Sequence, residues 1–184
     1  MDDSDIKIFT PASHADKDND ILDLVESIDH HRRNGNVARA RKLGKNLVKV
    51  ALQENVMDGF SGPEFRTPEV TTEIGVLLLF STEAALNYFL PNAQLSAIAI
   101  SSLHEAMENQ ESEFFKNVIE SPAYSLYYLS IRKGGEDVAR SIGESFSKLC
   151  QHPDSETFIA EGKRIYEMAV SEVEKDVLAE GFQD

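Results

Sequence analysis

Histidine beside acidic residues is the first pattern in this sequence that could do chemistry, because these side chains together bind metal ions. Glu26 and His30 lie one helical turn apart, and so do His104 and Glu108. The carboxylate sites of helical bundles need the motif Glu-x-x-His on two helices, and neither pair has that spacing. We therefore interpret both pairs as polar helix surfaces and predict neither a metal site nor another cofactor.

A nucleophilic enzyme would need Cys150 or a serine beside a base. His152 follows Cys150 closely, but the two flank a helix end before Pro153, and a single free cysteine usually packs in the interior. The sequence contains no nucleophile-elbow, phosphate-loop or dinucleotide-binding motif. We predict no catalytic residue. An enzyme built on a helical bundle, which a bound metal or a perturbed Glu or His would reveal, stays an alternative.

One segment of the chain is basic, although the whole chain has a net charge of −14. Residues 31–52 carry seven Lys and Arg and no Asp or Glu. Three of them lie at i, i+4 and i+8 and form what we call the basic stripe, Arg41, Lys45 and Lys49, with Arg39 and Lys42 beside it. We predict a contact surface for an acidic or phosphate-bearing partner. The alternative is a solvated helix face whose charges are offset by the protein's own carboxylates.

Three tyrosines form a second candidate surface. Tyr124 and Tyr128 share a helix face, Tyr127 lies about 60° from Tyr124, and Arg132 follows one turn beyond Tyr128. Tyrosine offers a large contact area with a polar tip, so we predict the edge of a partner-binding groove. At this spacing the same residues also suit a hydrophobic core, which is the alternative.

Six prolines and several glycines divide the chain into helix-patterned segments. Thr67-Pro68-Glu69 has the capping hydroxyl, first-turn proline and acidic residue of a helix start. No segment alternates with the two-residue period of a strand, so we expect no sheet. The expected helices cover residues 19–34, 37–51, 68–90, 92–108, 111–119, 122–133, 136–150 and 154–182, with a loop at 57–67.

These segments predict an all-α fold with 68–108 as its hydrophobic centre. We expect a flexible acidic arm at residues 1–18 and a single domain at 19–184, built from antiparallel helical hairpins. Segments 19–34 and 37–51 are expected to form one such hairpin. The architecture is either a tetratricopeptide-like array or an irregular bundle of seven to eight helices.

An internal similarity supports the hairpin interpretation. At a constant offset of 99 positions, residues 32–50 match residues 131–149. The identical pairs include Gly35 and Gly134, Ala40 and Ala139, Arg41 and Arg140, Gly44 and Gly143, and Lys49 and Lys148. In each copy a small residue and a glycine lie on the packing face of a helix, where we expect two backbones to approach closely.

Residues 123–153 resemble a tetratricopeptide hairpin at Leu126, Gly134 and Ala139. They depart from that family's pattern at Tyr127 and Ser130, as well as at other positions. The resemblance implies a protein-binding or peptide-binding scaffold.

Charge and composition exclude some classes of function. A net charge of −14 argues against a nucleic-acid binder, because such proteins present a basic surface to phosphates. Residues 74–90 are apolar except for Glu83 and a few polar groups, which favours a buried helix over a membrane span. One cysteine and the absence of an apolar leader favour a reducing, cytoplasmic location. The apolar face of 74–103 suggests a homodimer.

The function that these features predict is a non-enzymatic interaction module that binds a protein or peptide on a helical surface, and an acidic peptide is one candidate partner. Two alternatives stay open. One is a ligand-sensing regulatory domain with an apolar pocket among the central helices. The other is an acidic decoy surface that occupies a basic partner, in which case reversing the charges of the basic stripe would leave binding intact.

Overall fold

A computed structural model of the chain describes residues 25–52, 62–133 and 137–183. Eight α-helices lie entirely within these residues, residues 25–33 are also helical, and no strand occurs in these ranges. The expected acidic arm at 1–18 lies outside them. The helices are α2 (Asn36–Asn46), α3 (Val48–Ala51), α4 (Pro68–Phe89), α5 (Ala93–Gln110), α6 (Ser112–Ile119), α7 (Ala123–Lys133), α8 (Val138–Leu149) and α9 (Glu156–Glu180), with a 3₁₀ turn, η2 (Pro63–Arg66). The predicted all-α bundle of seven to eight helices is confirmed.

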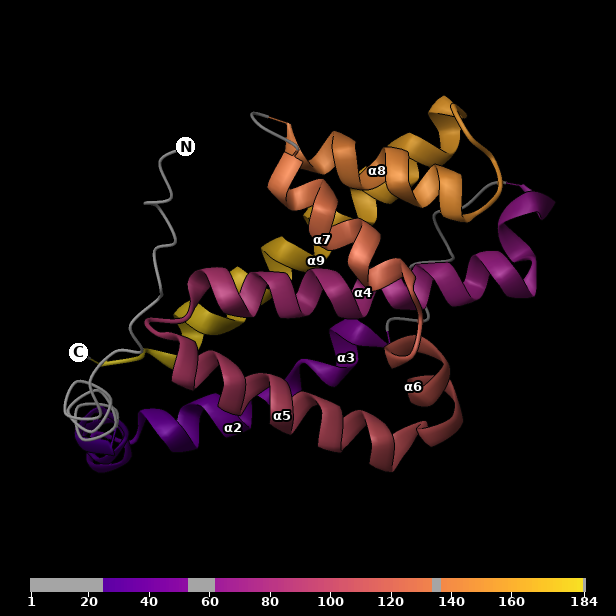
Figure 1. Cartoon of the computed structure of the whole chain (residues 1–184). Coiled ribbons are helices and arrows are strands. Elements are labelled where there is room, and N and C mark those ends of the chain that lie inside the picture. The colour runs from indigo at the N-terminus through magenta and orange to yellow at the C-terminus, as the bar shows by residue number, and fades with distance from the viewer. Residues whose placement is uncertain (1–24, 53–61, 134–136, 184) are drawn as a thin grey trace, which may run out of the picture.

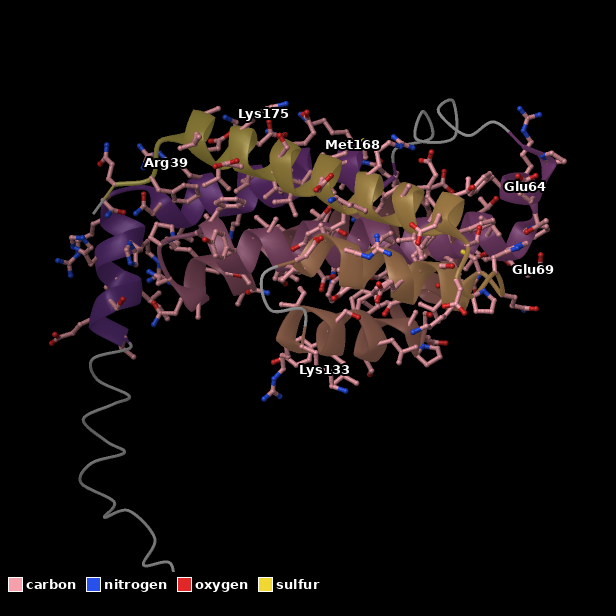
Figure 2. All side chains as sticks on the ribbon, turned by 90° about the horizontal axis from the view of Figure 1, so that it is seen from above. Arg39, Glu64, Glu69, Lys133, Met168 and Lys175 are labelled. Atoms are coloured by element: carbon pink, nitrogen blue, oxygen red, sulfur yellow. The ribbon has the colours of Figure 1, made fainter. Side chains whose placement is uncertain are left out.

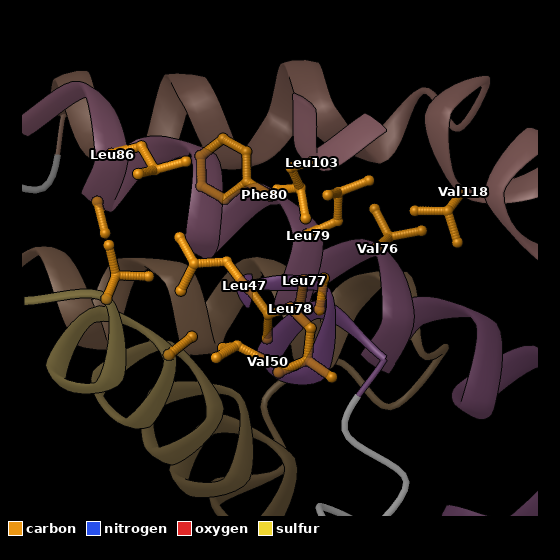
Figure 3. Packing of buried hydrophobic residues seen from close by; sticks show 14 of the residues in the cluster. Leu47, Val50, Val76, Leu77, Leu78, Leu79, Phe80, Leu86, Leu103 and Val118 are labelled. Atoms are coloured by element: carbon orange, nitrogen blue, oxygen red, sulfur yellow. The ribbon is translucent and has the colours of Figure 1, made fainter. Parts of the chain in front are cut away.

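Helix α4 forms the centre of the bundle (Figure 1). Its predicted start is confirmed: Pro68 is its first residue, and the Thr67 hydroxyl accepts a hydrogen bond from the Val70 amide at 3.3 Å. Every residue from Ile74 to Thr82 is buried, so this stretch is covered on all sides by neighbouring helices. Figure 3 shows its apolar side chains packed against Leu47, Val50 and Leu103.

Two close helix crossings flank α4, and the internal similarity of the sequence marks both. A β-carbon built on Gly44 of α2 would lie 2.1 Å from the carbonyl oxygen of Ala99 in α5. One built on Gly143 of α8 would lie 2.2 Å from the carbonyl oxygen of Ile159 in α9. Only glycine permits these backbone contacts, so the predicted close approach is confirmed at both positions.

The predicted hairpin of segments 19–34 and 37–51 is wrong. Figure 2 shows that the helix at 25–33 meets α2 at a steep angle, and α2 packs mainly on α5. Gly35, in the left-handed conformation with φ of 82°, makes the turn between them. The expected single helix 37–51 is also divided at Leu47 into α2 and α3, although its apolar stripe is buried as predicted.

Most of the apolar face of residues 74–103 is covered within the chain. Leu77, Leu79, Leu86, Leu95 and Leu103 are all inaccessible to solvent. The predicted homodimer stays a prediction, because burial within one chain does not test it. Within the described ranges, no helix has the combination of length and apolar character that crossing a bilayer requires.

Residues near both ends of the described chain are joined by reciprocal hydrogen bonds. The Asn36 amide donates to the carbonyl oxygen of Gln183 at 2.5 Å, and the Gln183 amide donates to the Asn36 side-chain oxygen at 3.0 Å. Asn36 is fully buried. The segment that follows α9 is thereby fixed to the first turn of α2.

Candidate functional site

An apolar groove of about 730 Å³ lies between the C-terminal half of α4 and helix α7. It forms because α7 covers α4 only in part, so that one face of α4 becomes accessible after Thr82. The groove is lined by Phe80, Glu83, Ala84, Asn87 and Tyr88 of α4 and by Tyr124, Ser125, Tyr128, Leu129 and Ile131 of α7.

The rim of this groove gathers exposed apolar side chains. Tyr88 is 82% exposed, Tyr128 58% and Leu129 42%. They make up three of the seven large hydrophobic residues that are exposed among the described residues. Single exposed apolar side chains are ordinary on protein surfaces, but several around one concave surface are typical of a binding site.

Glu83 provides the polar part of the groove. Its Oε1 atom lies 2.6 Å from Nε2 of His104 on α5, and it accepts a hydrogen bond of 3.3 Å from the Tyr124 hydroxyl. An ionised carboxylate can only accept, so the imidazole donates in that form of Glu83. The His104 ring in turn packs against the ring of Phe115, with centroids 5.3 Å apart.

The groove side chains are positioned by the core beneath them. The ring of Phe80 contacts the rings of Tyr124 and Tyr127, at centroid distances of 5.8 and 5.3 Å. Burial, and then the neighbouring Glu83 carboxylate, raises the pKa of the Tyr124 phenol well above its usual value. The phenol is therefore neutral at physiological pH and stays available as a hydrogen-bond donor to Glu83.

The three predicted tyrosines separate into different environments. Tyr124 and Tyr128 line the groove, as the surface interpretation expected. Tyr127 belongs to the core, because its side chain is fully buried, and burial raises its pKa well above the usual value. Arg132 is exposed one turn beyond Tyr128, but it is not among the residues that line the groove.

The basic residues of α2 and α3 do not line this groove, and most have partners within the protein. Lys42 pairs with Glu180 at 2.8 Å and Lys49 with Asp176 at 3.1 Å, both on α9. Arg39 donates to the carbonyl oxygen of Asn34 at 2.8 Å. Arg41 and Lys45 are exposed and have no ion-pair partner among the residues that the structure describes. Figure 1 shows α2 and α7 on opposite sides of α4, so the two predicted surfaces are not one site.

Of the ten residues that line the groove, the sequence identified only Tyr124 and Tyr128, so all five groove residues of α4 and three of α7 were missed. The available signal was Glu83 itself, the only charge in the apolar run 74–90. A single charge inside an apolar helix needs a polar partner on a neighbouring helix, which is the signal that points to this site. The hydroxyl of Ser96 on α5 donates to the side-chain oxygen of Asn87, a contact between two helices that spacing along one helix does not reveal.

The other candidate chemistry does not assemble into a site. His104 contacts Glu83 rather than Glu108, and Glu26 and His30 are both exposed. Burial, followed by the nearby Glu73, raises the pKa of the Cys150 thiol to about 12, so the thiol is not a nucleophile at neutral pH. Among the described residues, no three His, Cys, Asp or Glu side chains are grouped so as to hold a metal ion.

No protein family model, curated protein or solved structure shows a significant match to this chain.

Proposed function

We propose that this protein is a non-enzymatic interaction module that binds a short amphipathic helix of a partner protein between α4 and α7. The observation that supports this proposal is the groove itself, with its apolar lining and the exposed Tyr88, Tyr128 and Leu129 at its rim. An apolar groove bounded by two helices suits the apolar face of a third helix.

The helical architecture favours this mode of binding over others. Partners that add a β-strand need an exposed strand edge, and the described residues contain no strand. The tetratricopeptide resemblance of residues 123–153 agrees with a peptide-binding role. The proposal depends on the groove, however, and does not require a repeat.

A small apolar ligand is the second candidate for the same groove. Its volume of about 730 Å³ lies in the range of roughly 300–1,000 Å³ that ligand sites have. The ligand-sensing alternative called for an internal pocket, whereas this groove is open to solvent along α7. An open groove favours a helical segment, which keeps one polar face in water.

The experiment is a selection from a displayed library of short amphipathic helices, followed by affinity measurements on two variants. Tyr128→Asp places a charge in the groove, and we expect it to weaken the selected peptides about tenfold or more. Leu178→Asp is the matched control, because Leu178 is 73% exposed on α9 and does not line the groove. We expect it to bind like the wild type.

Two outcomes would contradict the proposal. The first is a library that yields no binder, and the second is a set of peptides that bind Tyr128→Asp as tightly as the wild type. Sedimentation velocity of the protein alone tests a third occupant: self-association that Tyr128→Asp abolishes would show that the groove takes a second copy of the chain.

A further inference from the structure

We propose that the groove selects partner segments that place a Lys or Arg side chain against Glu83. This inference rests on the proposed function and identifies the feature by which the groove distinguishes one apolar helix from another. Three features support it: the Glu83 carboxylate, the aromatic rings that line the groove beside it, and the negative net charge of the whole protein.

Glu83 is the only charged residue among the ten that line the groove. Both contacts of its carboxylate, to His104 and to Tyr124, are made by Oε1. Within the described part of the chain, Oε2 has no hydrogen-bond partner. The side chain is 18% exposed and Oε2 is not among the fully buried atoms that lack a partner, so water reaches this oxygen in the free protein.

A wholly apolar segment would bind this groove poorly. It would remove water from Oε2 and offer no donor in return, and a buried, unpaired carboxylate oxygen is strongly unfavourable. A segment that brings a Lys or Arg side chain replaces the lost water with a charge-assisted hydrogen bond. The carboxylate thus discriminates against apolar competitors as well as attracting basic ones.

The aromatic lining favours a cation over a neutral donor. Phe80, Tyr124 and Tyr128 share the groove with Glu83, and the faces of aromatic rings attract ammonium and guanidinium groups. The aliphatic stem of Lys or Arg packs on the same apolar surface while its charged end reaches Oε2. A serine or amide side chain would satisfy the hydrogen bond without either gain.

Long-range electrostatics act in the same direction. The net charge of −14 steers basic segments toward the protein. Arg132 and Lys133 at the end of α7 oppose this attraction locally, but both are exposed and neither lines the groove. Solvent screens them, whereas the mostly buried Glu83 is screened less.

The first test uses the peptides selected from the helix library against the wild-type protein. We expect Lys or Arg at one fixed position in the selected sequences. Replacing that residue by norleucine, an uncharged residue of similar length, should weaken binding to the wild type about tenfold and to Glu83→Gln less than about twofold. Glu105→Gln removes an exposed charge outside the groove and should respond like the wild type.

The outcomes separate this inference from the proposed function. Peptides that need Tyr128 but carry no fixed basic residue, or that bind Glu83→Gln and the wild type equally, would overturn the inference and leave the groove as a peptide site. A library without binders would overturn both proposals. Thermal melting of Glu83→Gln, whose amide oxygen can still accept from His104, verifies that the variant is folded.

A second measurement uses small probes in place of peptides. We expect ethylguanidinium to shift the NMR signals of groove residues in the wild type but not in Glu83→Gln. Ethylurea, its neutral counterpart, should leave both proteins unchanged. Equal responses to the two probes would contradict cation selection whatever the library yields.

Discussion

Two glutamates of α4, Glu73 and Glu83, differ in whether their carboxylates have hydrogen-bond partners. Glu83 has His104 and Tyr124 as partners. Glu73 has one buried oxygen, Oε2, without a hydrogen-bond partner among the described residues, and the buried hydroxyl of Tyr127 is in the same situation. Burial raises the pKa of Glu73. The ionised form of this residue therefore opposes folding.

This difference gives a prediction for Glu73→Gln. A carboxyl group whose pKa is raised in the folded state binds its proton more tightly there than in the unfolded chain. The free energy of unfolding therefore falls as the pH rises from about 4.5, the usual pKa of the group, through its raised pKa in the folded protein. The variant lacks this loss. We expect its free energy of unfolding at pH 7 to exceed that of the wild type by up to about 1 kcal/mol, because partial exposure screens the effect. Urea denaturation at several pH values measures the difference.

The gain should disappear below pH 4, where Glu73 is protonated in both states of the wild type. Glu69→Gln provides the control, because it removes the same charge from an exposed position of the same helix. We expect no gain there, since Glu69 stabilises the first turn of α4. A gain for Glu73→Gln that persists at low pH would contradict an origin in ionisation.

For single residues, the sequence indicates which side chains could form a site better than it indicates whether each one is buried and what it contacts. The spacing of Tyr124, Tyr127 and Tyr128 could not show which ring is buried, because only the packing of α4 against α7 decides this. Similarly, spacing along one helix paired His104 with Glu108. The actual partner, Glu83, lies on another helix, and such contacts are not visible in local sequence.

The helices themselves were largely predictable, because local signals determine where a helix begins and ends. Capping side chains, prolines and glycines place the bounds of α4, α5 and α7 within a few residues of the expected ones. The angle between neighbouring helices was not predictable. Helices 25–33 and α2 do not form a hairpin, because α2 finds a closer partner in α5, where Gly44 lets the two backbones touch.

The glycine crossings give a prediction for α2 and α8. Gly44→Ala and Gly143→Ala each place a methyl group against a backbone carbonyl of the neighbouring helix. That carbonyl cannot move away unless the two helices separate. We expect each to lower the free energy of unfolding by about 1–3 kcal/mol, although alanine favours a helix more than glycine does. Chemical denaturation of the purified variants measures this loss.

Asn46→Ala is the matched control for Gly44→Ala, because Asn46 is exposed on the same helix. Its free energy of unfolding should stay within about 0.5 kcal/mol of the wild-type value. If the two glycine variants were as stable as this control, the close crossings would not be required by the fold.

For the whole molecule, the net charge of −14 predicts a response to salt. Raising the ionic strength from about 0.01 M to about 0.15 M shortens the Debye length from ~30 Å to ~8 Å, which weakens repulsion among the acidic side chains. We expect sodium chloride to raise the melting temperature by about 2–4 °C over this range. Potassium chloride should have the same effect. A falling melting temperature would mean that ion pairs such as Lys42–Glu180 outweigh the repulsion.

The reciprocal contact between Asn36 and Gln183, together with the packing of α9 on α4, determines when the fold can be completed during synthesis. Some 90 residues separate the end of α4 from the end of α9, which takes roughly 5–18 s at ribosomal rates. During that interval α4, whose residues 74–82 are all buried in the folded protein, lacks the part of its cover that α9 provides. Until α9 emerges, the side of α4 that α9 covers in the folded protein stays exposed to solvent.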